Sequence, residues 1–166
     1  APLFAALGPQ GERWVPVHGI FSHEDVLPFH VAFAAFVEAR QADFEKHGVW
    51  VGGMFEYVGA AGFLYEIAMY WPDERSIYHD TMIDAEYLGN LPSPPANPAA
   101  REYVRQLKED LVDLYQAHNA GQFQLGKAYP YWDRRDPISQ QRIRSIKAST
   151  DPKGLLNPDA LGIPTS

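Results

Sequence analysis

Residues 49–71, VWVGGMFEYVGAAGFLYEIAMYW, predict a β-hairpin. Residues 49–58 and 63–71 are rich in β-branched and aromatic side chains, and the small residues 59–62 between them are suited to the turn. Gly52 and Gly53 interrupt the first arm, which indicates either a bulge or a place where another backbone or a flat ligand comes close. The hairpin is therefore the internal pair of strands around which the rest of the fold is arranged.

The segments on both sides of this hairpin alternate between strand and helix patterns. We expect a first strand over residues 14–21, with Pro16 at a sheet edge, and a long helix with an aromatic stripe over residues 28–47. A second helix is expected over residues 98–120 and a last strand over residues 122–127. This βαββαβ order predicts an α+β, ferredoxin-like fold, in which an antiparallel sheet carries both helices on one face.

A long excursion, residues 72–97, separates the hairpin from the second helix. Its first part is compatible with a short helix, whereas the run LPSPPANP at residues 91–98 is not, because closely spaced prolines remove backbone donors. An excursion of this length in a compact domain usually has a function or wraps another surface.

Residues 136–166 predict a helix followed by an extended tail. The Asp136 side chain can cap free N–H groups, and Pro137 suits the first helical turn. DPKG at residues 151–154 ends the helix. Apolar residues on the helix edge and in the tail could pin this segment against a larger body: Ile138, Ile143, Ile146, Leu155, Leu156, Leu161 and Ile163.

Composition excludes several classes of function. The chain has 166 residues, a formal net charge of −7 and no cysteine, which argues against binding to a phosphate backbone and rules out disulfides and thiol catalysis. No apolar run is long enough to cross a membrane. His23 and His30 with Glu24 and Asp25 fit no standard zinc spacing, so no metal site is expected. We expect a soluble protein of the cytoplasm or periplasm.

Two motifs near the chain end suggest a family. FQLGKAYPY at residues 123–131 is followed by a helix, by DPKGLLNP at residues 151–158 and by LGI at residues 161–163. Together they resemble the C-terminal end of FAD-linked oxidases of the vanillyl-alcohol oxidase and p-cresol methylhydroxylase superfamily. The resemblance implies a ferredoxin-like cap domain that covers the flavin ring and forms the substrate pocket, while a missing N-terminal domain holds most of the FAD.

The same resemblance implies a division of the chain. Residues 1–13 would be a linker from the missing FAD-binding domain, residues 14–135 the cap domain, and residues 136–166 a helix and tail that pack on the FAD domain. The implied activity is hydride transfer from a phenolic or hydroxylated small molecule to the flavin, and the chain alone is expected to be inactive.

The resemblance also implies candidate site residues. The residues that would bind, polarise or deprotonate the substrate are Tyr129, Tyr131, Arg134 and Glu66. Lys127 and Asn157 are expected near the cofactor. Judged without the resemblance, Glu56 and Glu66 are either solvated on an open sheet face or poised in a pocket, because the register is not determined by the sequence. Phe63-Leu64 stands where some relatives carry histidines, so covalent attachment of flavin there is not available.

Two alternatives remain open at this point. In the 2-hydroxyacid branch of the same superfamily, which includes D-lactate and glycolate enzymes, Lys127 or Arg134 would clamp a substrate carboxylate. The second alternative is a stand-alone ferredoxin-like binding module that forms a homodimer through its open sheet face.

Overall fold

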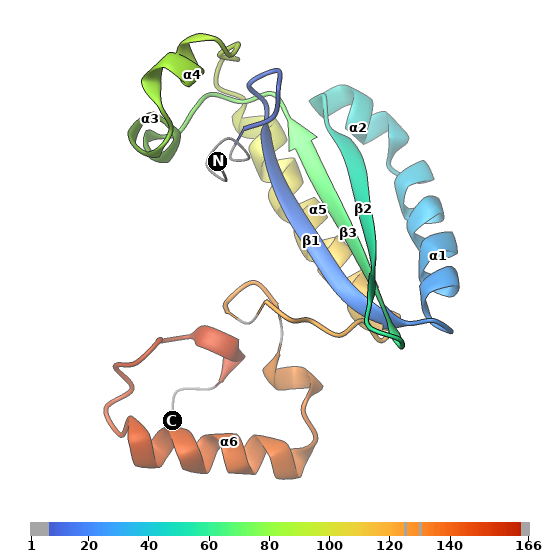
Figure 1. Ribbon diagram of the computed structural model, residues 1–166, viewed down its shortest axis with the longest axis vertical. Coiled ribbons are helices and arrows are strands. Elements are labelled where there is room, and N and C mark those ends of the chain that lie inside the picture. Colours follow the sequence, from blue (N-terminus) through green and yellow to red (C-terminus); the bar gives the residue numbers. More distant parts are fainter. Residues whose placement is uncertain (1–6, 125, 130, 164–166) are drawn as a thin grey trace. The chain divides into compact units, whose positions relative to one another are not determined.

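The computed structural model describes residues 7–124, 126–129 and 131–163, and the chain divides into two compact units, Ala1–Gly121 and Gln122–Ser166 (Figure 1). The elements of the first unit are β1 (Arg13–Ser22), α1 (Val26–Glu38), α2 (Gln41–His47), β2 (Trp50–Val58), β3 (Gly62–Trp71), α3 (Ile77–Met82), α4 (Ala85–Gly89) and α5 (Pro98–Ala117). The predicted hairpin corresponds to β2 and β3, and the predicted combination of helices with an antiparallel sheet is confirmed.

The sheet has three antiparallel strands in the order β1-β3-β2. Helix α5 packs against β1 and β3, and α1 and α2 pack against α5. Figure 1 shows α5 behind the sheet and no helix of the first unit in front of it. The helices therefore leave one face of the sheet to other partners. Because β1 is an outer strand, Pro16 lies at a sheet edge, as predicted.

The predicted last strand at residues 122–127 is wrong for the residues that the structure describes there. Only one bridge forms next to β1: the Gly121 N–H donates to the Ile20 carbonyl oxygen at 2.7 Å, and the Ile20 N–H donates to the Gly121 carbonyl oxygen at 2.9 Å. A longer pairing would bring the chain alongside Pro16, which has no N–H to donate. The described sheet therefore has three strands rather than four.

The predicted single helix over residues 28–47 is also wrong, because it is broken into α1 and α2. The break lies at Arg40, whose φ of −113° is outside the helical range. Its guanidinium donates to the Phe36 carbonyl oxygen at 3.3 Å, lies 3.7 Å from the Phe36 ring centroid and pairs with Asp110 at 3.1 Å. A basic side chain that binds the last carbonyls of a helix is a common C-terminal stop.

The core of the first unit lies between the sheet and α5. One stripe of α5 is buried, namely Val104, Leu107, Leu111 and Tyr115. The Tyr115 hydroxyl donates to the carbonyl oxygens of Tyr65 in β3 at 2.9 Å and of Val17 in β1 at 3.3 Å, so the helix is tied to both strands. The absence of a side chain at Gly19 permits this contact, because a Cβ there would stand 2.8 Å from the Tyr115 ring.

A buried carboxylate joins three segments of this unit. The side chain of Asp73 is fully buried and forms ion pairs with Arg13 at 3.1 Å and with Arg101 at 2.8 Å. It also accepts hydrogen bonds from the backbone N–H groups of Glu74 and Asn97, at 2.9 and 2.8 Å. Asp73 therefore holds the start of β1, the start of α5 and both ends of the excursion between β3 and α5.

The second unit contains η2 (Trp132–Arg134), α6 (Pro137–Thr150) and η3 (Ala160–Gly162). The predicted helix start is confirmed: Asp136 accepts hydrogen bonds from the N–H groups of Ile138 and Ser139, each at 3.0 Å. At the other end, Asp151 accepts the N–H groups of Leu155 and Leu156 at 2.9 Å and pairs with Lys147 at 2.5 Å. Four apolar side chains of α6 and the tail are exposed: Ile138, Ile146, Leu155 and Leu156.

Candidate functional site

The register of the sheet shows which side chains face away from α5. His18 pairs with Glu66, and Glu66 pairs with Met54 on the other side. Because side chains alternate along a strand, these three lie on the face opposite to Val17 and Ile67, which are buried under α5. The side chains of Met54, Glu56, Leu64 and Glu66 therefore lie on the face opposite to α5. The sequence alone did not decide which face of the hairpin carries them.

An acid–base pair lies on this face, which is open only in part because Leu64 and Ala68 next to the pair are buried. The Nδ1 atom of His18 is 3.8 Å from Oε2 of Glu66, and the two side chains are 1% and 21% exposed. Burial, followed by the positive charge of Lys108, lowers the pKa of His18. Burial also raises the pKa of Glu66. Both changes favour the neutral form, and groups whose pKa is perturbed by burial are candidates for proton transfer.

A row of aromatic rings crosses the same face, one ring from each strand. The ring centroids of Trp14 and Tyr70 are 6.2 Å apart with an interplanar angle of 24°, and those of Tyr70 and Trp50 are 5.6 Å apart with an angle of 10°. Trp50 is 44% exposed. Such a row offers flat apolar surface on which another planar group can stack.

The glycines of β2 make room for aromatic rings of this chain. A Cβ at Gly52 would lie 3.3 Å from the ring of Tyr70, and a Cβ at Gly53 would lie 2.7 Å from the ring of Phe55. The pairing of β2 with β3 continues through both glycines without an extra residue. The register therefore excludes a bulge at this point, and close approach by Tyr70 and Phe55 explains both glycines.

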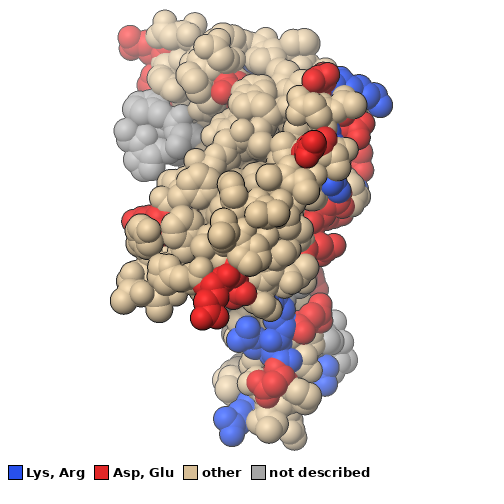
Figure 2. All heavy atoms as spheres, turned by 90° about the vertical axis from the view of Figure 1, so that its right-hand side faces the viewer, with Lys and Arg blue, Asp and Glu red and all other residues tan. Residues whose placement is uncertain are grey.

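The outer strand β2 is exposed along most of its length. Phe55 and Tyr57 are 52% and 72% exposed, although they lie on the same face as α5, because α5 covers β1 and β3. The sequence of β2 has one charged residue, Glu56. Figure 2 views the first unit from the side of α1 and shows a broad uncharged surface there. This side therefore carries few charges for a chain with many acidic residues.

The predicted substrate residues other than Glu66 belong to the second unit. Tyr129 is buried and Tyr131 is half-buried, while Arg134 ends the short helix η2. Burial, followed by the charge of Arg135, lowers the pKa of Arg134. Tyr131 and Arg134 are thus close along the chain in one turn, whereas Glu66 lies in the first unit. Their assignment to one substrate pocket stays a prediction.

The predicted cofactor residues also lie in the second unit, and both are exposed. Lys127 lies 3.9 Å from Asp159, and Asn157 adopts a positive φ of 45° at the turn that precedes η3. Lys147 donates to the Leu156 carbonyl oxygen, so the DPKGLLNP segment is held in shape by α6 itself. The tail motif thus has a local structural explanation, and the cofactor role of Lys127 and Asn157 stays a prediction.

His18 is the residue of the open face that sequence reasoning missed. It is buried and lies next to Glu66. The sequence contains a signal for this: His18 is a polar residue inside a mostly apolar strand, between Val17 and Gly19. Only the pairing register of β1 with β3 shows that His18 lies opposite Glu66.

Comparisons of this chain with protein-family models, with curated proteins and with solved structures found no significant match. Over the described residues, no helix has both the length and the apolar character needed to cross a membrane.

Proposed function

We propose that this chain is the cap, or substrate-binding, domain of an FAD-dependent oxidoreductase that transfers a hydride from a phenolic or hydroxylated small molecule to the flavin. The observation that carries the proposal is the sheet face without a helix cover, where the pair His18 and Glu66 lies on the same side as a row of stacked aromatic rings, four residues further along β1 and β3. A face of this kind suits the roof of a flat ring system.

The residues of this face fit the ring end of FAD better than its phosphate end. Trp50 presents exposed indole surface, and Glu66 and His18 supply proton-transfer groups. The sequence has no glycine-rich phosphate loop. We therefore propose that the pyrophosphate is held by a further domain and that the chain alone is inactive. The exposed apolar side chains of α6 and the tail support this, because they offer a surface for such a domain.

In this proposal bound FAD supplies the hydride acceptor. The raised pKa of Glu66 suits it to take the hydroxyl proton of the substrate as the C–H hydride leaves, so that a carbonyl or a quinone methide results. Neutral His18 lies beside it, at a distance longer than a direct hydrogen bond. Tyr129, Tyr131 and Arg134 bind or polarise the substrate oxygen, and Lys127 and Asn157 contact the cofactor.

We also propose that the cap domain has the full ferredoxin-like fold with a fourth strand. The bridge between Ile20 and Gly121 lies where a fourth strand would start beside β1. We propose that this pairing lengthens when the cap is assembled with its FAD domain, which gives the order of a split βαβ sheet.

The test uses the full-length protein that contains this chain. It should be purified yellow, with the absorption bands of oxidised flavin, and substrate should bleach them in the absence of an acceptor. Glu66→Gln should slow the bleaching by about 10²–10⁴-fold at unchanged flavin content, which is the usual contribution of a general base. Glu56→Gln is the matched control, because Glu56 is an exposed carboxylate on the same face. Colourless protein, or equal effects of both variants, would overturn the proposal.

Two other functions are each favoured by one observation. The half-buried guanidinium of Arg134 suits a carboxylate clamp, so a 2-hydroxyacid substrate is the alternative within the same chemistry. The exposed outer strand β2 suits a binding module that dimerises through its sheet. Bleaching by 2-hydroxyacids but not by phenols would select the first alternative. A flavin-free dimer that is broken by a proline in β2 would select the second.

A further inference from the structure

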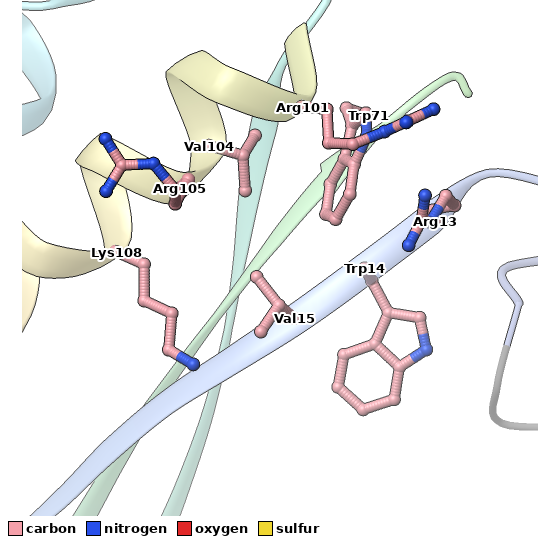
Figure 3. Close-up of a pocket in the computed structure, with 8 residues that line it drawn as sticks. All are labelled: Arg13, Trp14, Val15, Trp71, Arg101, Val104, Arg105 and Lys108. Atoms are coloured by element: carbon pink, nitrogen blue, oxygen red, sulfur yellow. The ribbon is translucent and has the colours of Figure 1, made fainter. Parts of the chain in front are cut away.

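A groove lies between β1 and α5, on the side of the sheet that the helix covers (Figure 3). Its volume is about 310 Å³, which is within the range of small-molecule sites. Four of its lining residues are basic: Arg13, Arg101, Arg105 and Lys108. In a chain with a net charge of −7, this concentration of cations is unusual.

Helical spacing gathers three of these cations. Arg101, Arg105 and Lys108 follow one another at intervals of four and three residues, so they share one side of α5 with the buried Val104. Figure 3 shows Lys108 extended from α5 toward β1 at one end of the groove, whereas Arg13 and Arg101 lie near Trp71 at the other end. Arg105 is turned away from β1.

Most of these charges are already paired. Arg13 and Arg101 bind Asp73 at 3.1 and 2.8 Å. Arg105 binds two carboxylates of its own helix, Glu102 at 2.7 Å and Glu109 at 2.6 Å. Among the residues that the structure describes, Lys108 forms no ion pair. The groove thus has one cation available to an incoming anion.

The floor of the groove is apolar. Val15 and Val104 lie between Lys108 and the arginine pair, and Trp71 closes the far end (Figure 3). Val104 and Trp71 are 3% and 5% exposed, so their positions are held by the core. A ligand that fits must therefore combine a negative charge with an apolar body about the size of a ring.

We propose that this groove binds a small organic carboxylate, with the carboxylate at the Lys108 ammonium and an apolar ring over Val15 and Val104. Partial burial between a helix and a strand strengthens the charge interaction relative to open water. An inorganic anion would leave the accessible surface of half-buried Val15 uncovered, and a neutral ring would leave Lys108 without a partner. The site is separate from the open sheet face and does not rest on the proposed flavin chemistry.

The effect of Lys108 on His18 supports this placement. The charge of Lys108 contributes to lowering the pKa of His18, which also faces Glu66, so the ammonium acts on the sheet through β1. A carboxylate bound at Lys108 should offset that charge. Binding in the groove should therefore raise the pKa of His18, and this provides a readout that does not depend on enzyme activity.

The experiment is a titration of the ¹⁵N-labelled 166-residue chain with benzoate, followed by NMR. Benzoate should shift the backbone signals of Val15, Val104 and Lys108, and benzyl alcohol should bind at least about tenfold more weakly, as expected when one charge interaction is lost. Lys108→Gln should weaken benzoate binding by about tenfold. Lys46→Gln, which removes an exposed lysine of α2, should leave the affinity unchanged.

Four results would overturn the proposal. They are equal binding of benzoate and benzyl alcohol, equal affinity of Lys108→Gln and the parent chain, shifts confined to residues outside the groove, and shifts of the groove signals by an acidic peptide but not by benzoate. The last result would assign the groove to a polypeptide partner. Far-UV circular dichroism of both lysine variants checks that the fold is retained.

Discussion

His18 and Glu66 face each other across β1 and β3, with Nδ1 of the imidazole 3.8 Å from Oε2 of the carboxyl group. This distance exceeds that of a direct hydrogen bond. The pKa of His18 is lowered and that of Glu66 is raised, in both cases chiefly by burial. The open face of the sheet therefore presents two proton-transfer groups that are both biased toward their neutral forms.

The first prediction concerns the pH dependence of stability. Unfolded His18 takes up a proton below about pH 6.5, whereas folded His18 resists it because its pKa is lowered. The unfolded state then binds more protons, so the free energy of unfolding should fall as pH falls through this range. His18→Gln lacks this response. Denaturant unfolding between about pH 5 and pH 7.5 gives the free energy of unfolding of the parent chain and of His18→Gln. The contributions of distant titratable groups largely cancel in the difference between the two values.

Glu66 lies next to His18, so its titration is coupled to that of His18 and both proteins should be compared in a Glu66→Gln background. The raised pKa of Glu66 acts in the opposite sense, because folded Glu66 holds a proton that the unfolded state releases. Its contribution to stability therefore falls as pH rises from the unfolded pKa to the folded pKa of this group. A difference curve between the parent chain and His18→Gln that is flat with pH would contradict the assignment of a lowered pKa to His18.

The second prediction concerns Asp73. Its hydrogen bonds and ion pairs with Arg101, Asn97 and Trp71 outweigh its burial and hold its pKa far below the usual range. Asp73→Asn should lower the free energy of unfolding by about 3 kcal/mol at pH 7, since the arginines lose their partner. The same contribution is complete above about pH 4 and should be lost progressively at lower pH, as the unfolded carboxyl group and then the folded one become protonated.

Asp110→Asn is the control for this change. Asp110 pairs with Arg40 and accepts a hydrogen bond from Gln106, and the side chains of Asp110 and Arg40 are about one third exposed, so its loss should cost less than about 1 kcal/mol. Thermal unfolding measures both variants. Equal losses would show that Asp73 is no more than a surface ion pair.

The third prediction concerns the row of aromatic rings. Gly52→Val should push the Tyr70 ring away, because even a Cβ would stand 3.3 Å from it, and should cost about 1–3 kcal/mol. The near-UV circular dichroism of the stacked rings should fall in parallel. In a Tyr70→Ala background the same valine should cost much less, and an undiminished cost would mean that strand geometry rather than the ring is responsible.

The fourth prediction concerns the tail of the second unit. Asp151→Asn weakens the ion pair with Lys147 and the hydrogen bonds from Leu155 and Leu156. A loss of about 1–2 kcal/mol in local stability should speed trypsin cleavage after Lys153 by about tenfold. Asp159→Asn is the control, because Asp159 is exposed and lies 3.9 Å from Lys127. Cleavage at the parental rate would show that the tail shape does not depend on Asp151.

Local patterns in the sequence predicted most of the elements. The hairpin arms, the edge position of Pro16 and the capped start of α6 follow from side-chain alternation, proline chemistry and an aspartate before a proline, all of which act within a few residues. The break at Arg40 and the end of pairing at Gly121 depend on partners distant in the sequence, such as Asp110 and β1, which periodicity does not reveal.

The candidate site was predictable only in part. Glu66 could be singled out because a carboxylate in an apolar strand is costly unless it is solvated or functional. The partnership with His18 and the aromatic row require the register of three strands, and the groove at Lys108 requires the packing of α5 on β1. These relationships arise between elements and therefore lie beyond local sequence patterns.

The excursion between β3 and α5 begins at Glu74 and ends before Asn97, and the backbone N–H groups of both residues donate to the same Asp73 carboxylate. The loop is thus closed at its neck, and its length does not enter the geometry of the sheet. A change in the length of the segment that contains α3 and α4 would leave the two ends of the loop joined. The aspartate at the neck is therefore a position that such a change should leave alone.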